Sequence, residues 1–401
     1  MSTTRALLCS EFVPKIIEVQ VNQRAAGRIS SGRPWVYRSD LITAGEAQPG
    51  QVVRVLDGRN NRLGCAHYSS TSEIVLRMLP QETTVTDIGF YRRLIQRAQD
   101  FRERIVADTD SYRVVFADAD LMPGLIVDRY GPHVVVQTLT QGTDSVKSDI
   151  VEAIQEVLKP ETITERNDAI SRTKEGLERI SAPVYGKPPA DFVATINSIK
   201  FQVSLAAGQK TGLFLDQREN WRATEAHARG KALDCFSYTG GFALHMARKC
   251  ESVTAIDSSK PALRQLSANA KLNEITNIQA RHGKAFDMLK QYVLSRRQFD
   301  TVVIDPPAFA KTVKQRRDAL TAYKDVNLKA LKLLKKDGIL VTCSCSQHIS
   351  EADLLDVLAA ASLDTGRRLA IVERRTQARD HPILLTAPET HYLKCFVIRV
   401  L

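Results

Sequence analysis

Several features of common protein classes are missing from this sequence of 401 residues. No run approaches the roughly 18 uncharged apolar residues that a membrane-spanning helix needs. The first residues also lack the basic-then-apolar pattern of a secretory signal, because Cys9, Glu11 and Lys15 interrupt them. We therefore expect a soluble, cytoplasmic protein without a membrane partner.

Cysteine and histidine are too few and too scattered for a disulfide scaffold or a metal site. The seven cysteines are an odd number, whereas disulfide-rich secreted domains carry denser and usually even sets. Cys343 and Cys345 would supply only two metal ligands, and the eight histidines form no cluster. We predict no bound metal.

Positive charge, in contrast, is plentiful. The chain holds 56 Lys and Arg against 45 Asp and Glu, and its net charge is +11. Such a surplus favours a polyanionic partner, whose phosphates attract it. Many soluble proteins are basic without binding nucleic acid, so charge alone leaves both interpretations open.

Apolar patterning divides the chain into three parts. Residues 1–82 read as short strands with turns, which predicts a small β-barrel. Residues 83–190 combine a helical pattern with further strands, which predicts a central α+β domain. Three prolines and a glycine over residues 181–191 indicate the second boundary.

The third part, residues 191–401, alternates strands with helical stretches. This alternation predicts a doubly wound, Rossmann-like parallel sheet with helices on both faces. Residues 392–401 read as one more strand, which we expect at the edge of the sheet.

Arginines and aromatic rings lie close together over residues 27–38, GRISSGRPWVYR. Such interleaving suits phosphate contact combined with base stacking, so Arg33, Trp35 and Arg38 are candidate RNA contacts. Alternatively, Trp35 belongs to the core and the arginines form a solvated rim.

A nucleotide-type pocket is indicated at the end of the strand that contains Asp234. The turn Ser237-Tyr238-Thr239-Gly240-Gly241 follows, and its glycines let a ligand approach the backbone. Asp257 ends the next strand, where a carboxylate can accept hydrogen bonds from ribose hydroxyls. The G-x-G-x-x-G spacing of the dinucleotide fingerprint is absent, because Phe236 and Tyr238 occupy the first turn. This absence disfavours a dehydrogenase. An acid before the turn suits a ligand with an amino group, which favours S-adenosylmethionine over NAD.

Two further strand ends indicate chemistry on a base. Asp305-Pro306-Pro307-Ala308-Phe309 follows one predicted strand, and the segment 342–346, TCSCS, ends another. A carboxylate on a rigid turn beside an aromatic ring suits a flat heterocycle, and a cysteine can attack such a ring covalently. Strand alternation places Cys343 in a buried layer and Cys345 nearer the crevice, so we favour Cys345 as the nucleophile. Both cysteines could also be inert core residues.

A basic helical stretch over residues 311–336 begins beside the expected base pocket. Its Lys311, Lys314 and Arg316 are candidate contacts for the phosphates that flank a target base. A charge run is as often simply the solvated face of a helix.

These motifs resemble those of bacterial 23S ribosomal RNA cytosine-5 methyltransferases of the large-subunit methyltransferase I type. The resemblance spans nearly the whole chain and is carried by residues 32–38 (GRPWVYR), 119–130 (ADLMPGLIVDRY) and 208–218 (GQKTGLFLDQR). It implies a PUA domain, a central domain and a class I methyltransferase domain. It also implies ribosomal RNA as substrate, attack of Cys345 on cytosine and a homodimer.

The resemblance also implies that Phe214 and Gln217 join the cofactor pocket. Together with the strand-end residues, the predicted S-adenosylmethionine contacts are Phe214, Gln217, Asp234, Phe236, Ser237, Tyr238, Thr239, Gly240, Asp257, Ser258, Gly283 and Asp305. The predicted catalytic residues are Asp305, Pro306, Phe309 and Cys345.

The chain departs from the family pattern at three places. It has Gly283-Lys284 where the family often has an Asp, Cys343 where an aromatic is usual, and Pro307 where many RNA cytosine-5 enzymes have a second cysteine. Two other functions stay open, namely methylation of another base atom, such as a guanine nitrogen, and a non-catalytic role in RNA binding or assembly.

Overall fold

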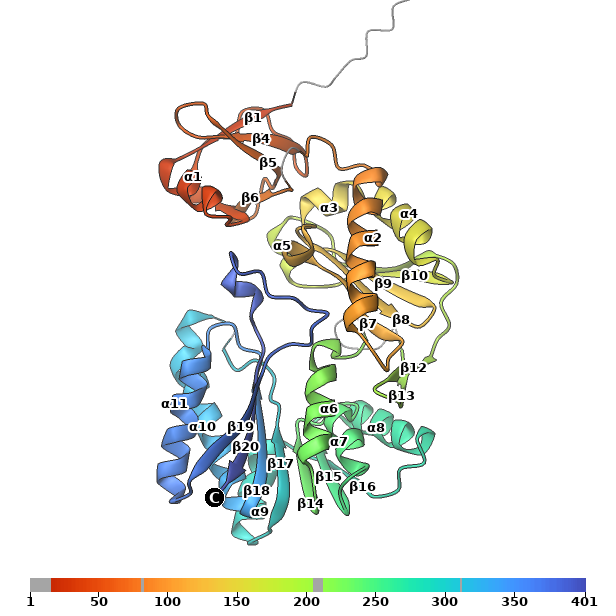
Figure 1. The fold of residues 1–401 in the computed structure, drawn as a ribbon, viewed down its shortest axis with the longest axis vertical. Coiled ribbons are helices and arrows are strands. Elements are labelled where there is room, and N and C mark those ends of the chain that lie inside the picture. The colour runs from red at the N-terminus through yellow and green to blue at the C-terminus, as the bar shows by residue number, and fades with distance from the viewer. Residues whose placement is uncertain (1–15, 81–82, 205–211, 311) are drawn as a thin grey trace, which may run out of the picture.

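The computed structural model describes residues 16–80, 83–204, 212–310 and 312–401, which form three parts along the long axis of the molecule (Figure 1). Within these ranges no helix is long and apolar enough to cross a membrane. The N-terminal part lies at one end, the central part in the middle and the C-terminal part at the other end.

The N-terminal part is a six-stranded sheet around a small core of valines. Its strand order is β2-β6-β5-β4-β1-β3, with β1 (Glu18–Val21), β2 (Trp35–Tyr37), β3 (Leu41–Thr43), β4 (Val52–Leu56), β5 (Arg62–Tyr68) and β6 (Ile74–Met78). A turn of 3-10 helix, η1 (Arg38–Asp40), precedes β3. The prediction of strands and turns alone missed α1 (Gln23–Ser30), which Asn22 caps by accepting from the Ala25 N–H at 2.9 Å.

The central part is a five-stranded mixed sheet with order β11-β10-β9-β8-β7, packed against two long helices (Figure 1). Its elements are α2 (Ile88–Ile105), β7 (Ser111–Phe116), η2 (Ala117–Asp120), β8 (Leu125–Tyr130), β9 (His133–Thr138), α3 (Gln141–Ser145), α4 (Lys147–Leu158), β10 (Thr162–Asn167), α5 (Ser171–Lys174) and β11 (Ile180–Tyr185). Pro183, which helped to indicate a boundary, lies inside β11, an edge strand where a missing N–H is tolerated.

The C-terminal part begins with a hairpin and continues into a seven-stranded sheet. The hairpin pairs β12 (Phe192–Ile196) with β13 (Ile199–Val203), and η3 (Leu215–Gln217) then precedes the sheet. The sheet order is β16-β15-β14-β17-β18-β20-β19. Its strands are β14 (Lys231–Cys235), β15 (Ser252–Asp257), β16 (Ile278–His282), β17 (Phe299–Ile304), β18 (Leu334–Ser344), β19 (Leu369–Arg375) and β20 (Lys394–Val400).

The predicted parallel sheet with helices on both faces is confirmed for β14 to β18. One face is covered by α6 (Arg218–His227), α7 (Gly241–Ala247) and α8 (Lys260–Leu272). The other face is covered by α9 (Ala285–Leu294), α10 (Arg316–Leu333) and α11 (Glu351–Thr365). Two 3-10 turns, η4 (Val313–Gln315) and η5 (Pro388–Thr390), lie in the connections.

The expectation that the last strand lies at an edge is wrong. β20 is inserted antiparallel between β18 and β19, so β19 forms that edge of the sheet. The burial pattern agrees with this order, because six of the seven residues of β20 are buried, whereas β19 has no buried residue and exposes Ile371, Val372 and Arg374 at the edge.

A buried ion network joins the central part to the C-terminal part. Arg102 of α2 forms a bidentate pair with Asp120 and donates to the Asp380 carbonyl at 2.9 Å. The Asp380 carboxylate accepts the Arg113 N–H at 2.9 Å and lies 3.2 Å from Arg218. Burial opposes ionisation of Asp380, yet His381, Arg218 and this N–H together hold its pKa well below the usual range. The two parts are therefore joined by charges that are largely shielded from water.

Candidate functional site

The predicted site residues meet at the carboxyl ends of the parallel strands. β20 runs antiparallel to β18 and ends away from the central part, so β14, β15, β17 and β18 end on the side that faces the central part (Figure 1). Open α/β sheets bind ligands at this edge.

Asp234 is a fully buried carboxylate next to the end of β14. Its Oδ2 accepts from the Ser237 hydroxyl at 2.6 Å, while its Oδ1 has no hydrogen-bond partner among the described residues. Burial, with a smaller contribution from Asp305 and Asp257, raises the pKa of Asp234 to about 7, although the Ser237 bond opposes this. A carboxylate in this state requires a donor, and a cationic amino group would satisfy it.

The turn after β14 has an unusual backbone. Phe236 and Tyr238 have φ of 66° and 48°, and Gly240 has φ of 95°. Left-handed conformations at two bulky residues cost energy and are typical of sites that hold a ligand. The Thr239 carbonyl accepts from Asn269 of α8 at 3.1 Å, which anchors the turn. The ring of Phe214 lies edge-on to Tyr238, with centroids 5.3 Å apart, so both predicted residues line the same corner.

Asp257, at the end of β15, is held by main-chain donors. Its Oδ2 accepts the Tyr238 N–H at 2.9 Å, and its Oδ1 accepts the Ser259 N–H at 2.7 Å. Each oxygen keeps a second lone pair that can accept a hydroxyl. Ser258 and Gly283 lie at the same strand end, where the Ser258 carbonyl faces His282 at 3.1 Å and the Gly283 N–H donates to the Asp257 carbonyl at 3.0 Å.

Gln217 connects the expected cofactor pocket with the expected catalytic segment. Its Nε2 donates to Asp305 Oδ1 at 3.0 Å, and its Oε1 accepts from Asn220 at 2.7 Å. Gln217 is buried and Asp305 is half-buried, so this hydrogen bond restricts the position of the carboxylate.

Cys345 and Cys343 differ in access. Cys343 is fully buried against Cys395 of the neighbouring strand, and burial raises the pKa of its thiol well above the usual value. Cys345 follows the last residue of β18 and is half-buried, whereas the other five cysteines in the described ranges are buried. Access therefore favours Cys345 as the reactive thiol.

Aromatic rings form a wall beside Cys345. Phe309 is half-buried, and its ring lies 4.8 Å from that of Tyr323 and 5.7 Å from that of Phe286. Pro306 is buried. The rings of Phe286 and Tyr323 are tilted by 47° and 51° to that of Phe309, so the wall is apolar but not flat, and the face of the Phe309 ring is the part that suits a heterocyclic base.

Sequence reasoning missed two residues that surround the Cys345 turn, Tyr323 and Lys394. The Tyr323 hydroxyl contacts Ser344 Oγ at 2.9 Å and Ser346 Oγ at 3.1 Å. Lys394 Nζ donates to the Ser346 carbonyl at 2.8 Å. The only available signal was a lysine placed directly before the apolar run CFVIRV, where burial of its charge is unexpected.

Two of the three predicted RNA contacts of the N-terminal part, Arg33 and Trp35, bind residues of the other two parts. Arg33 forms two hydrogen bonds to Glu389 at 2.7 and 3.1 Å, which raise the pKa of Arg33. Trp35 is half-buried, not core, and its indole N–H donates to Asp118 at 2.9 Å. Arg38 donates to the carbonyls of Ser69 and Ser72. RNA contact by these three residues stays a prediction, because their polar groups already have protein partners.

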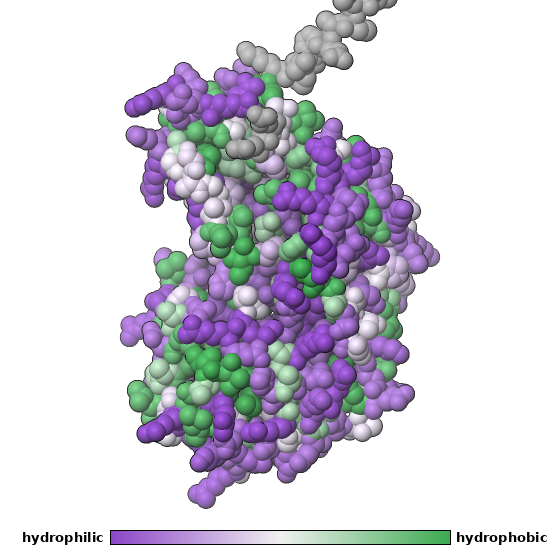
Figure 2. All heavy atoms as spheres, viewed as in Figure 1, coloured by the Kyte–Doolittle hydropathy of each residue, from purple (hydrophilic) through white to green (hydrophobic). Residues whose placement is uncertain are grey.

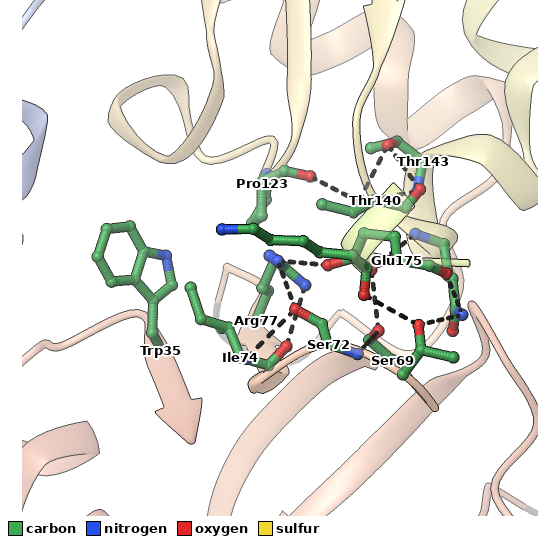
Figure 3. A network of polar contacts seen from close by, with 12 residues as sticks. Trp35, Ser69, Ser72, Ile74, Arg77, Pro123, Thr140, Thr143 and Glu175 are labelled. Carbon is green, nitrogen blue, oxygen red and sulfur yellow. Dashed lines mark hydrogen bonds and ion pairs between the residues drawn. The ribbon is translucent and has the colours of Figure 1, made fainter. Parts of the chain in front are cut away.

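A second polar network fastens the N-terminal part to the central part (Figure 3). Glu175, after α5, is almost fully buried and pairs with Arg77 at 2.7 Å. It also accepts from Ser69 Oγ at 2.9 Å and from the Gln141 N–H at 3.3 Å. Trp35 projects from β2 beside this network (Figure 3). The N-terminal part is therefore set in one orientation relative to the sheet below it.

The basic segment gives a mixed result. Lys311 lies outside the described residues, and Lys314 is exposed in η4. Arg316, at the start of α10, forms an ion pair with Asp353. Lys314 is therefore the described residue of this set that is most open to a phosphate.

A cavity of about 750 Å³ lies where the three parts meet. Trp35 of the N-terminal part, Phe116 of the central part and Tyr392 of the C-terminal part contribute to its walls, and so does Gln347, two residues beyond Cys345. On the face shown in Figure 2 the outline of the molecule is indented between its two ends, and the surface is mostly hydrophilic with a hydrophobic area on the C-terminal part. Within the described ranges no group of His, Cys, Asp and Glu residues is placed to hold a metal.

Comparison with known proteins places these features in a family. Residues 19–81 match the model of a PUA-like domain, and residues 226–384 match that of a methyltransferase domain. The chain is 36% identical over 378 residues to ribosomal RNA large subunit methyltransferase I of Tolumonas auensis, which covers 92% of this chain and 95% of the relative. It is 35% identical over 379 residues to the protein of that name from Escherichia coli O9:H4, with the same coverage.

Solved structures show the same fold. The methyltransferase SMU.776 in complex with SAH superposes with a TM-score of 0.83 over 96% of this chain and all of that one, at 22% identity. A SAM-dependent methyltransferase from Streptococcus mutans gives a TM-score of 0.81 at the same identity and coverage. The predicted arrangement of a PUA domain, a central domain and a Rossmann-like methyltransferase domain is confirmed. The chain belongs to the ribosomal RNA large subunit methyltransferase I family.

Proposed function

We propose that this protein transfers a methyl group from S-adenosylmethionine to carbon 5 of a cytosine in large-subunit ribosomal RNA. The names of its relatives support the substrate class. The observation that carries the choice of atom is a half-buried thiol, Cys345, at the strand end next to the one that bears Asp305. Methylation of an exocyclic or ring nitrogen needs no such nucleophile.

The residues around the strand ends fit the methyl donor. The unpartnered Oδ1 of buried Asp234 suits the amino group of its methionine moiety, and Asp257 suits the ribose hydroxyls. Phe214 and Tyr238 are half-buried at one corner, where an adenine ring can pack, whereas the Phe236 ring lies near those of Phe286 and Phe309. When bound, S-adenosylmethionine supplies an electrophilic methyl group on a sulfonium.

The chain's own residues then bind the cytosine and attack it. Phe309 packs against the base, and Asp305 hydrogen-bonds its N3 edge. The Cys345 thiolate adds to C6, and the electron pair of the C5–C6 bond becomes available at C5 to take the methyl group. Loss of the C5 proton to a base and expulsion of the thiolate restore the aromatic ring.

A complementation experiment tests this proposal. Ribosomal RNA nucleosides are quantified by mass spectrometry from cells that lack the gene and express wild type, Cys345→Ser or Cys343→Ser. We expect 5-methylcytidine with wild type, none with Cys345→Ser and a normal level with the matched Cys343→Ser control. A methylated guanine that survives Cys345→Ser would contradict the proposal, and failure of the purified protein to bind S-adenosylmethionine in calorimetry would favour a non-catalytic role.

A further inference from the structure

Lys394 is a buried cation beside the proposed nucleophile. It is only 4% exposed, and it lies directly opposite Ser344 in the pairing of β20 with β18. Its Nζ donates to the Ser346 carbonyl at 2.8 Å and to the Tyr392 carbonyl at 3.0 Å. A buried ammonium group is costly unless anionic or polar groups compensate it. The two carbonyl acceptors compensate the buried charge of Lys394 only in part.

The groups that face Lys394 come from three elements. Cys345 lies at the end of β18, and Glu351 and Asp353 lie at the start of α11. Tyr323 of α10 touches the same turn through Ser344 and Ser346. Burial lowers the pKa of Lys394 to about 8, and of the groups that oppose this shift Cys345 contributes most, ahead of Asp353 and Glu351.

The carboxylates of Asp353 and Glu351 each have an arginine as a partner. Asp353 forms an ion pair with Arg316 and accepts the main-chain N–H of Ser350 at 2.9 Å. Glu351 lies 3.6 Å from Arg374. The thiol of Cys345 is consequently the ionisable neighbour to which the charge of Lys394 can contribute most.

We propose that Lys394 is a positioning residue that maintains Cys345 as a thiolate and holds the turn that presents it to the crevice. This inference rests on the covalent function proposed above. The proton is conserved between Cys345 and Lys394, because it passes from the thiol to the neutral amine and leaves a thiolate and an ammonium ion. A thiolate is the nucleophilic form of cysteine, and a nearby cation favours it.

The test measures thiol reactivity without RNA and without a methyl donor. The purified full-length protein is alkylated with iodoacetamide between pH 5.5 and 9.5, and modification of the Cys345 peptide is followed by mass spectrometry. An opposite charge at close range changes a thiolate population by about tenfold or more at a pH below the thiol's midpoint. We therefore expect Lys394→Met to be alkylated about tenfold more slowly at pH 6.5, with its rate rising at a higher pH.

Two matched variants separate charge from packing. Lys394→Arg keeps the cation and should retain most of the wild-type rate at pH 6.5. Lys324→Met removes a lysine of α10 whose ion pair with Asp364 lies on the surface, so it should match wild type. Folding of each variant is checked by thermal melting, and Lys394→Gln replaces Lys394→Met if the latter does not fold.

Alkylation of Lys394→Met or Lys394→Gln at the wild-type rate across the pH range would overturn the proposal. Equal slowing in Lys394→Arg would also overturn it, because the charge would then not be the cause. The outcome is distinguishable from failure of the proposed function. A charge-dependent thiol in a protein that makes no 5-methylcytidine would refute the function alone, whereas normal methylation with a thiol indifferent to Lys394 would refute this inference alone.

Discussion

Asp234 provides the sharpest test of the cofactor pocket, because burial of its ionised carboxylate destabilises the protein unless a ligand donates a hydrogen bond to it. Its pKa rises from 3.8 to about 7 in the folded protein, mainly through burial. A shift of roughly three pKa units corresponds to about 4 kcal/mol, at 1.36 kcal/mol per unit. A raised folded-state pKa means that this contribution to stability is fully present below pH 3.8 and is lost as the pH rises through about 7. The ligand-free protein should therefore lose stability between pH 4 and pH 8 because of this group.

Replacing Asp234 with Asn removes the charge at nearly constant volume. We expect the free energy of unfolding at pH 8, measured by urea denaturation without ligand, to rise by up to about 4 kcal/mol, and its decline between pH 5 and pH 8 to flatten. S-adenosylmethionine should bind about ten- to hundredfold more weakly by calorimetry, since a charge-assisted hydrogen bond contributes about 1.5–3 kcal/mol. Ser237→Ala, which removes only the neighbouring hydroxyl, is the control and should weaken binding less. Unchanged affinity in Asp234→Asn, together with an unchanged pH profile, would refute this account of the pocket.

Three further changes test other parts of the structure. Asp380→Asn should lower the free energy of unfolding by about 3–5 kcal/mol at pH 7, because buried Arg218 loses its counter-charge. The depressed pKa of Asp380 makes this loss disappear only in strong acid, which denaturation at pH 3 and pH 7 would show. Gly240→Ala should cost about 1–2 kcal/mol and weaken methyl-donor binding, since φ is +95° and a Cβ would lie 2.9 Å from Leu266; equal melting and binding would contradict this. Glu175→Gln should increase hydrogen exchange across β5 and β6, because Arg77 loses its buried partner, whereas Glu156→Gln, in a surface pair with Arg92, should not.

The parallel sheet and its strand-end residues were predictable because they follow strong local patterns. β14, β15, β17 and β18 are apolar runs that end at Asp, Pro or Ser-rich turns, and such patterns are visible without tertiary information. Strand alternation also placed Cys343 in a buried layer, as its complete burial confirms.

Other elements were not predictable because tertiary contacts decide them. β10 has the polar sequence TITERN, yet all six residues are buried, and Glu165 is compensated by Lys147. β20 reads as a terminal strand, but its place inside the sheet depends on its pairing with β19, which comes earlier in the chain.

The roles of some polar side chains also depend on partners that are distant in sequence. Arg33 and Trp35 look like RNA contacts in a basic aromatic segment, but Glu389 and Asp118, far away in sequence, occupy their polar groups. Lys394 could not be connected with Cys345 either, because only the pairing of β20 with β18 brings them together. A local pattern indicates what a side chain can do, and the fold decides which partner it meets.

The central claim, that Cys345 attacks a cytosine, can be tested by trapping the covalent complex. Ribosomal RNA transcribed with 5-fluorocytidine is incubated with S-adenosylmethionine and the wild-type protein, Cys343→Ser or Cys345→Ser, and the products are separated on a denaturing gel. Fluorine at C5 prevents the proton loss that releases the enzyme, so wild type and Cys343→Ser should form an RNA–protein band that depends on the methyl donor. Its absence with active wild-type protein, or its presence with Cys345→Ser, would contradict the account.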